Sequence, residues 1–191
     1  RTRDKAEVFT PSWICNAQNN LVDEQWFGRK DVFNIQKEMS WKATADKIAF
    51  PDDRQHTWQK YVDAQRLEIS CGEAPYLVSR YDTVTGETIP ISQRIGLLDR
   101  KLRVIGENTD TEEEWLTWTK RAFQSVYGFE YQGDSLLLAR ENLFVTFVEV
   151  YRERFGKLPN LRQMKVIANI IAWNLWQMDS TKYVVPGSCK E

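Results

Sequence analysis

The alternation of apolar and polar positions along this chain predicts an α/β fold. Short apolar runs at Leu67–Cys71, 129–132 and 173–179 have the length and the bounding residues of buried strands. Between these runs, apolar residues recur every three or four positions, which is the period of a helix. Strands that alternate with helices pair in parallel within one open sheet. We therefore expect the three runs to form three parallel strands.

Capping residues place helices between these strands. Thr111 precedes three glutamates, and acidic residues in a first turn interact favourably with the helix dipole. Glycine often follows the last turn of a helix, so we expect Gly128 to close the helix that begins at Thr111. Thr10 is expected to cap the first helix, with Pro11 in its first turn. Further helices are expected near Asp52, at 73–80, at 95–105, at 135–154 and from Asn160.

The chain is expected to have two parts. Residues 1–65 are predicted to form a helical N-terminal segment, and residues 66–191 a partial α/β domain with an insertion near 82–110. A length of 191 residues suits one domain or slightly more, and a hydrophobic fraction of 42% is enough to bury a core. Residues 29–50 show no clear period, and the run at 83–88 is typical of a turn.

Charge and cysteine content narrow the class of protein. The net charge of −1 gives no general attraction for nucleic acid. Cys15, Cys71 and Cys189 are odd in number and form no Cys-x-x-Cys pair, which indicates a reduced, cytoplasmic chain without a zinc site. No apolar run is long enough to span a membrane. Because the chain begins at Arg1, we expect a piece of a longer polypeptide; a processed whole protein is the alternative.

Three predicted strand ends carry the candidate binding residues. Ligands of open parallel sheets lie beyond the carboxyl ends of the strands. The first end offers Glu68 and Gly72, the second Glu130 and the third Asp179. A carboxylate beside a glycine turn is the arrangement that holds the two hydroxyls of a ribose, because its two oxygens accept from both. Each residue has an alternative interpretation. Glu130 could be an ordinary exposed glutamate, Asp179 a loop or helix-capping aspartate, and Gly72 a purely structural glycine.

Other chemistries have less support in the sequence. The single histidine, His56, falls in a predicted helix away from the strand ends, which favours a surface role over that of a general base. Cys71 has no adjacent base and is interpreted as a packing residue. The glycine turn does not match the phosphate-binding pattern Gly-x-x-x-x-Gly-Lys-Ser/Thr.

Four segments together resemble a known family. They resemble, in order, the Phe-Thr-Pro, glycine, second-strand and third-strand motifs of class I S-adenosylmethionine-dependent DNA adenine-N6 methyltransferases. The similarity is greatest to the large subunits and fused enzymes of bacterial restriction-modification systems, and it extends through nearly the whole chain. The segments are Glu7-Val8-Phe9-Thr10-Pro11, Leu67-Glu68-Ile69-Ser70-Cys71-Gly72-Glu73-Ala74-Pro75-Tyr76-Leu77, Tyr127-Gly128-Phe129-Glu130-Tyr131 followed by Leu138-Ala139-Arg140-Glu141-Asn142-Leu143, and Asn174-Leu175-Trp176-Gln177-Met178-Asp179.

The resemblance implies a Rossmann-like methyltransferase fold that binds S-adenosylmethionine. It implies that the first motif covers the cofactor, with Thr10 near the methionine carboxylate. The glycine motif would face the methionine moiety, Glu130 would bind the ribose hydroxyls, and Asp179 would accept from the amino group of the cofactor's adenine. The cofactor-binding residues implied in this way are Phe9, Thr10, Pro11, Glu68, Ser70, Gly72, Glu130 and Asp179.

Two departures from the family pattern matter. Glu73 and Ala74 stand where the family has the end of a Gly-x-Gly turn, which adds a charge and a methyl group. The family's catalytic Asn/Asp-Pro-Pro-Tyr/Phe segment, which binds the flipped-out adenine, does not occur in these 191 residues. No catalytic residue is therefore assigned in this chain, and the chain alone is expected to be inactive. The fourth strand is also missing, so the first strand is expected to have an open edge.

The resemblance implies DNA as a partner, contacted mostly through regions outside this chain, and a specificity or restriction subunit. A degenerate methyltransferase-like module that holds a partner without catalysis is the second interpretation. An unrelated α/β dinucleotide enzyme is the third, although the missing second glycine argues against it.

Overall fold

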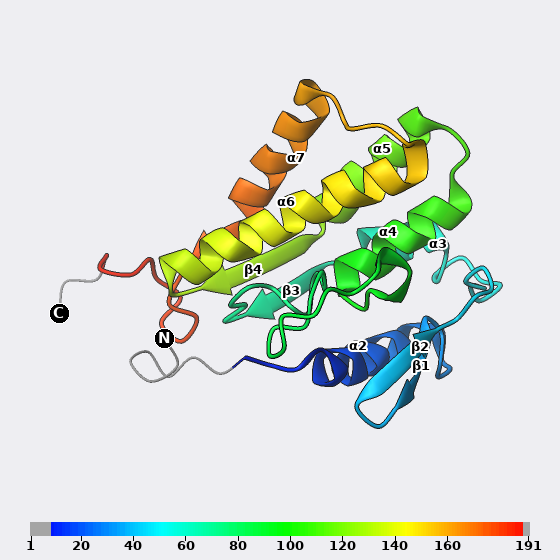
Figure 1. The fold of residues 1–191 in the computed structure, drawn as a ribbon, viewed down its shortest axis with the longest axis horizontal. Coiled ribbons are helices and arrows are strands. Elements are labelled where there is room, and N and C mark those ends of the chain that lie inside the picture. Colours follow the sequence, from blue (N-terminus) through cyan, green and yellow to red (C-terminus); the bar gives the residue numbers. More distant parts are fainter. Residues whose placement is uncertain (1–8, 189–191) are drawn as a thin grey trace.

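The computed structural model describes residues 9–188, so Glu7 and Val8 of the first motif and Cys189 lie outside the described residues. Helices surround a small sheet, and the long helix α6 runs along strand β4 (Figure 1). The helices are α2 (Ser12–Phe27), α3 (Trp58–Asp63), α4 (Leu97–Asn108), α5 (Glu112–Gln124), α6 (Gly133–Phe155) and α7 (Leu161–Asn174), with a 3-10 turn at Ile91–Gln93. Within this range no helix is both long and apolar enough to cross a membrane.

The central sheet confirms the predicted α/β class. It contains β3 (Arg66–Ile69), β4 (Val126–Glu130) and β5 (Leu175–Gln177) in the order β3-β4-β5. Both pairs are parallel, with Glu68 opposite Gly128 and Gly128 opposite Leu175. The carboxyl ends of β3 and β4 therefore lie side by side, and this is the edge at which the sequence predicts a binding site.

The N-terminal segment is not purely helical, because it contains a hairpin that the sequence did not reveal. Strands β1 (Asn34–Lys37) and β2 (Ser40–Ala43) pair antiparallel next to α2 (Figure 1). The hairpin reverses the usual alternation, because Asn34 is buried while Ile35 is about half exposed. The segment therefore shows no regular hydrophobic alternation in the sequence, and the turn at Glu38 has a positive φ of 45° without a glycine.

Residues 73–80 form turns, so the helix predicted there is wrong. Gly72 and Ala74 both adopt left-handed φ angles, 54° and 62°, which prevents a helix from starting at this point. Pro75 further limits the conformation of Ala74. The segment is nevertheless well packed, because Leu77 and Val78 belong to the hydrophobic core.

Three predicted helix boundaries are also corrected. Gly128 lies inside β4, where a Cβ would come within 3.1 Å of Cys71 Sγ, and α5 ends earlier at Gln124. Thr57 caps α3, so this helix begins at Trp58 and His56 lies in the preceding loop. Pro11 occupies the N-cap position of α2, where Thr10 was expected.

One hydrophobic core joins the two expected parts of the chain. Phe27, Phe33 and Tyr61 from the N-terminal segment belong to the same buried cluster as residues of α4, α5 and α6. A buried ion pair between Arg100 and Asp23 adds a polar link, and Tyr61 Oη donates to Asp23 Oδ1 at 2.8 Å.

The first strand of the sheet has an unpaired edge. Within the described residues β3 pairs only with β4. Leu67 and Ile69 of β3 are 50% and 54% exposed. This agrees with the expected open edge, which is a feature that promotes association between chains.

Candidate functional site

A pocket of about 210 Å³ lies at the carboxyl ends of β3 and β4. It is built from three segments that are far apart in the sequence, at residues 9–10, 68–76 and 130–135, with one further residue at 83. Six of the eight residues predicted from the sequence line it: Phe9, Thr10, Glu68, Ser70, Gly72 and Glu130.

Glu130 joins the ends of the two strands. Its side chain is nearly buried, with 8% exposure at the last position of β4. The Gly72 amide donates to Oε2 at 2.7 Å, and the Gln132 amide donates to Oε1 at 2.8 Å. A carboxylate oxygen accepts up to two hydrogen bonds, so each oxygen retains capacity for a ligand.

Glu68 contributes a carboxylate that is only partly satisfied. The Tyr76 amide donates to Oε1 at a long 3.4 Å, while Oε2 is buried without a hydrogen-bond partner. Burial raises the pKa of this carboxyl from 4.5 to about 8; the negative charge of Glu130 adds to the rise, and the backbone amides of Tyr76 and Leu77 oppose it. A cation placed beside Glu68 would favour its charged form, so this oxygen suits a positively charged ligand group.

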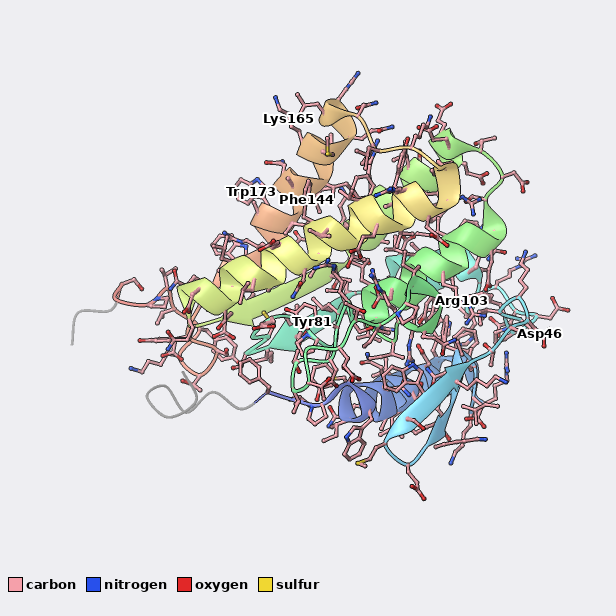
Figure 2. The ribbon with its side chains drawn as sticks, viewed as in Figure 1. Asp46, Tyr81, Arg103, Phe144, Lys165 and Trp173 are labelled. Carbon is pink, nitrogen blue, oxygen red and sulfur yellow. The ribbon has the colours of Figure 1, made fainter. Side chains whose placement is uncertain are left out.

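The pocket is acidic. Glu68, Glu73 and Glu130 line it, and no lysine, arginine or histidine among the described residues does so. Glu73 accepts a hydrogen bond of 2.6 Å from Tyr81 Oη, and Tyr81 extends from the loop between β3 and α4 (Figure 2). Acidic side chains without a countercharge favour cationic ligands and disfavour anionic ones, and Glu68, whose pKa is about 8, adds its charge once a cation lies beside it.

The two departures from the family pattern affect different places. Ala74 is fully buried in the hydrophobic core and does not line the pocket, so its methyl group occupies no space at the site. Glu73 does line the pocket and adds to its negative charge. Of the two departures, only Glu73 can therefore affect how closely a cofactor approaches this turn.

Two of the predicted residues lie outside the pocket lining. Pro11 begins α2, directly after Thr10. Asp179 follows β5, where its Oδ1 accepts from the Thr181 amide at 3.0 Å and from Thr181 Oγ1 at 2.6 Å. These hydrogen bonds lower the pKa of Asp179 and hold its side chain in a local turn. The next residue, Ser180, brings its Oγ within 3.2 Å of Ser70 Oγ, so this turn approaches the rim.

The sequence did not reveal how the Phe-Thr-Pro segment is held over the pocket. Thr83 Oγ1 donates to the Thr10 carbonyl at 2.8 Å, and the Ser12 amide donates to Asp82 Oδ2 at 2.8 Å. Asp82 therefore caps α2 from 70 residues away. The turn after Asp82 is visible in the sequence, but nothing there indicates its distant partner.

The remaining candidate chemistries find no support. Cys71 is buried, and burial raises the pKa of its thiol, with Glu68 and Glu130 adding to the effect, so it is a poor nucleophile. Within residues 9–188, no group of three or more histidine, cysteine or acidic side chains is placed to hold a metal ion. A comparison with protein-family models, curated proteins and solved structures gives no match.

Proposed function

We propose that this chain is the cofactor-binding part of an S-adenosylmethionine-dependent DNA adenine-N6 methyltransferase of a restriction-modification system. The observation that carries the proposal is the convergence of the three motif segments on one pocket at the ends of adjacent parallel strands. The ends of adjacent parallel strands lie at one edge in any such sheet, so the specific support is that residues 9–10 reach the same pocket from outside the sheet.

The charge of the pocket supports this cofactor over a dinucleotide. S-adenosylmethionine carries a sulfonium and an ammonium group, which suit a pocket lined by three acidic side chains, of which Glu68 becomes charged when a cation binds beside it. A dinucleotide carries an anionic pyrophosphate, which the same carboxylates would repel. The acidic pocket therefore argues against the unrelated dinucleotide enzyme.

The roles of the individual residues follow from their free hydrogen-bonding capacity. Glu130 retains acceptor capacity on both oxygens for two ribose hydroxyls, and Glu68 Oε2 is an unused acceptor for a cationic group. The bound cofactor supplies an activated methyl group for transfer to an amine. The pocket is smaller than the 300–1,000 Å³ or so that is usual for ligands of this size. Binding therefore requires the pocket to widen, and Phe9 at its rim is 36% exposed.

Methyl transfer itself is assigned to a longer polypeptide or assembly. The adenine-binding Asn/Asp-Pro-Pro-Tyr segment is not part of this sequence, so nothing in this chain takes the target base. In this proposal DNA and a specificity or restriction subunit contact the rest of that assembly.

The test is a calorimetric titration of S-adenosylmethionine into the chain. We expect binding, and we expect Glu130→Gln to weaken it by about tenfold, since charge-assisted hydrogen bonds contribute about 1.5–3 kcal/mol. Glu68→Gln is expected to weaken it as well, because the variant removes charge from the unpartnered oxygen. Glu113→Gln, an exposed glutamate on α5, is the control and leaves affinity unchanged. Absence of binding, or equal affinity of Glu130→Gln and the wild type, contradicts the proposal.

A degenerate, partner-holding module is the second candidate. One observation favours it: both oxygens of Glu130 already accept backbone amides, which gives this residue a structural role without any ligand. On this interpretation Glu130→Gln lowers the unfolding temperature while S-adenosylmethionine has no effect on either protein.

A further inference from the structure

A second and larger cavity, of about 680 Å³, lies away from the strand ends. Its floor is α4, and its walls are α6, the region of β2 and the segment at 91–94. Arg103 extends from α4 toward the hairpin (Figure 2), where its Nη2 donates to the Thr44 carbonyl at 2.8 Å. This cavity shares no lining residue with the acidic pocket.

Four of the residues that line this cavity each have a buried polar atom without a hydrogen-bond partner. Buried polar atoms are nearly always hydrogen-bonded to protein, water or a ligand, so these four atoms mark places around the cavity where such a partner would be accommodated. Three of the four atoms are donors. The atoms are Arg94 Nη1, Asp99 Oδ1, Arg100 Nε and Trp115 Nε1.

Three of these four side chains are held by hydrogen bonds through their other polar atoms. Arg94 Nη2 is paired with Glu149, and Arg100 Nη2 donates to Asn16 Oδ1 at 2.9 Å. Asp99 Oδ2 accepts from the amide of Ser79 at 2.8 Å. The unpartnered atoms are therefore preorganised, which lowers the cost of binding a ligand.

The cavity has an excess of positive charge. Glu149 pairs with both Arg80 and Arg94, so one carboxylate serves two guanidinium groups. Lys42 and Arg154 line the cavity and have no carboxylate partner within residues 9–188; Arg154 donates only to the carbonyls of Gly106 and Thr109.

Acidic residues offset only part of this charge. Glu107 is paired with Arg103, which leaves Glu153 and Asp99 on the cavity wall. Burial raises the pKa of Asp99, which reduces the negative charge that it contributes. The balance favours an anionic ligand.

We propose that this cavity binds an organic phosphate with a planar ring, of the size of a nucleoside monophosphate. Arg94 is the residue that would take the phosphate, because guanidinium groups match phosphate oxygens well and its Nη1 is free. Lys42 lines the same cavity, and the Ala43 amide after it donates to Gln93 Oε1 at 3.0 Å. Phe33, Leu102 and Val150 give apolar wall for a ring, and the volume lies within the usual range of about 300–1,000 Å³.

The test is a calorimetric titration of AMP into the full chain, with adenosine and inorganic phosphate as partial probes. We expect one AMP to bind per chain. Both partial probes are expected to bind at least about tenfold more weakly than AMP. Arg94→Lys keeps the positive charge but loses the forked pair of donors. This variant is expected to bind AMP about tenfold more weakly than the wild type. If that variant does not fold, Lys42→Ala at an exposed position is expected to weaken AMP by about threefold.

A matched pair of variants separates a ligand from ordinary buried water. Trp115→Phe removes a donor at the cavity and is expected to weaken AMP by about fivefold. Trp26→Phe removes the other unpartnered indole donor, which lies outside the cavity, and leaves AMP affinity unchanged.

Three results overturn the proposal. The first is that AMP does not bind. The second is that Trp115→Phe and Trp26→Phe bind AMP equally well, which means that the Trp115 donor meets only water. The third is that Glu130→Gln weakens AMP as strongly as Arg94→Lys, which places AMP in the acidic pocket instead.

Discussion

At the scale of single residues, two buried ionisable groups give the fold opposite responses to pH. Glu68 holds a proton more tightly in the folded chain than in the unfolded chain, because burial raises the pKa of its carboxyl to about 8. Lys101 is almost fully buried, and burial lowers the pKa of its ammonium group from 10.5 to about 7. The two pH ranges overlap only between about pH 7 and pH 8, so variants of each residue separate the two effects.

For Glu68, the stability contributed by its raised pKa is lost as pH rises from about 4.5 to about 8. Over that range the folded state holds a proton that the unfolded state has released. The free energy of unfolding therefore falls by at most about 1.4 kcal/mol per pH unit in this range. Glu68→Gln is expected to flatten this part of the profile, measured as the free energy of unfolding in urea at several pH values. A variant with the wild-type slope would show that Glu68 is ionised in the fold.

For Lys101, the sign is reversed. Between about pH 7 and pH 10.5 the unfolded state binds a proton that the folded state lacks, so stability increases with pH. Lys101→Met removes this dependence. It also removes the donor to the Ala64 carbonyl, while Ser125 Oγ keeps its hydrogen bond to the Val62 carbonyl. Urea titrations at pH 7, 8 and 9 compare the two proteins, and parallel profiles would contradict the assignment.

At the scale of elements, the loop after β3 is fastened to the start of α4. The Leu97 and Leu98 amides donate to the Tyr76 and Leu77 carbonyls, each at 2.8 Å. Gly96 permits this approach, because a Cβ at this position would lie 2.3 Å from the Leu77 oxygen. The backbone that hydrogen-bonds Glu68 is thus held by the helix that lines the second cavity.

Gly96→Ala is therefore expected to destabilise the protein by about 3 kcal/mol or more, because the added methyl group meets backbone that cannot move aside. Gly106→Ala, in the same helix, is the matched control. Its Cβ would lie 3.5 Å from Arg154 Nη1, and alanine favours the helix by about 0.5–1 kcal/mol. The measurement is the midpoint of thermal unfolding of both variants. Equal midpoints would contradict the close approach of the Gly96 and Leu77 backbones.

The sequence predicted those elements whose packing follows a regular period. The strands β4 and β5 and the helices α4 to α7 contribute apolar residues to the core, whereas β3 was recognised as a strand from its short apolar run although Leu67 and Ile69 are about half exposed. The hairpin was missed because it buries Asn34, which hydrogen-bonds Asn16 across a polar contact that no hydrophobic pattern reports. The turns at 73–80 were missed because the left-handed Ala74 has no signature in residue type.

At the scale of the whole molecule, six of the eight residues predicted for the site line one pocket, although parts of the surrounding structure were not predicted. Strand ends in a parallel sheet must meet at one edge, so Glu68, Gly72 and Glu130 came together as the topology requires. The contacts of Asp82 and the cavity around Arg94 depend on how separate segments pack, and the sequence carries no local signal for them. Asp179 was placed at the correct strand end, but its side chain serves a turn.

The shared core has a consequence for how the molecule responds to its ligands. Phe27, Phe33 and Tyr61 pack in the same cluster as residues of α4 to α6. The N-terminal segment that covers the acidic pocket and the strand ends beneath it therefore belong to one cooperative unit. Within residues 9–188, the buried cluster therefore extends across the boundary predicted at residue 65. A molecule that tightens the strand ends therefore also protects the distant hairpin against unfolding, although it touches no residue there.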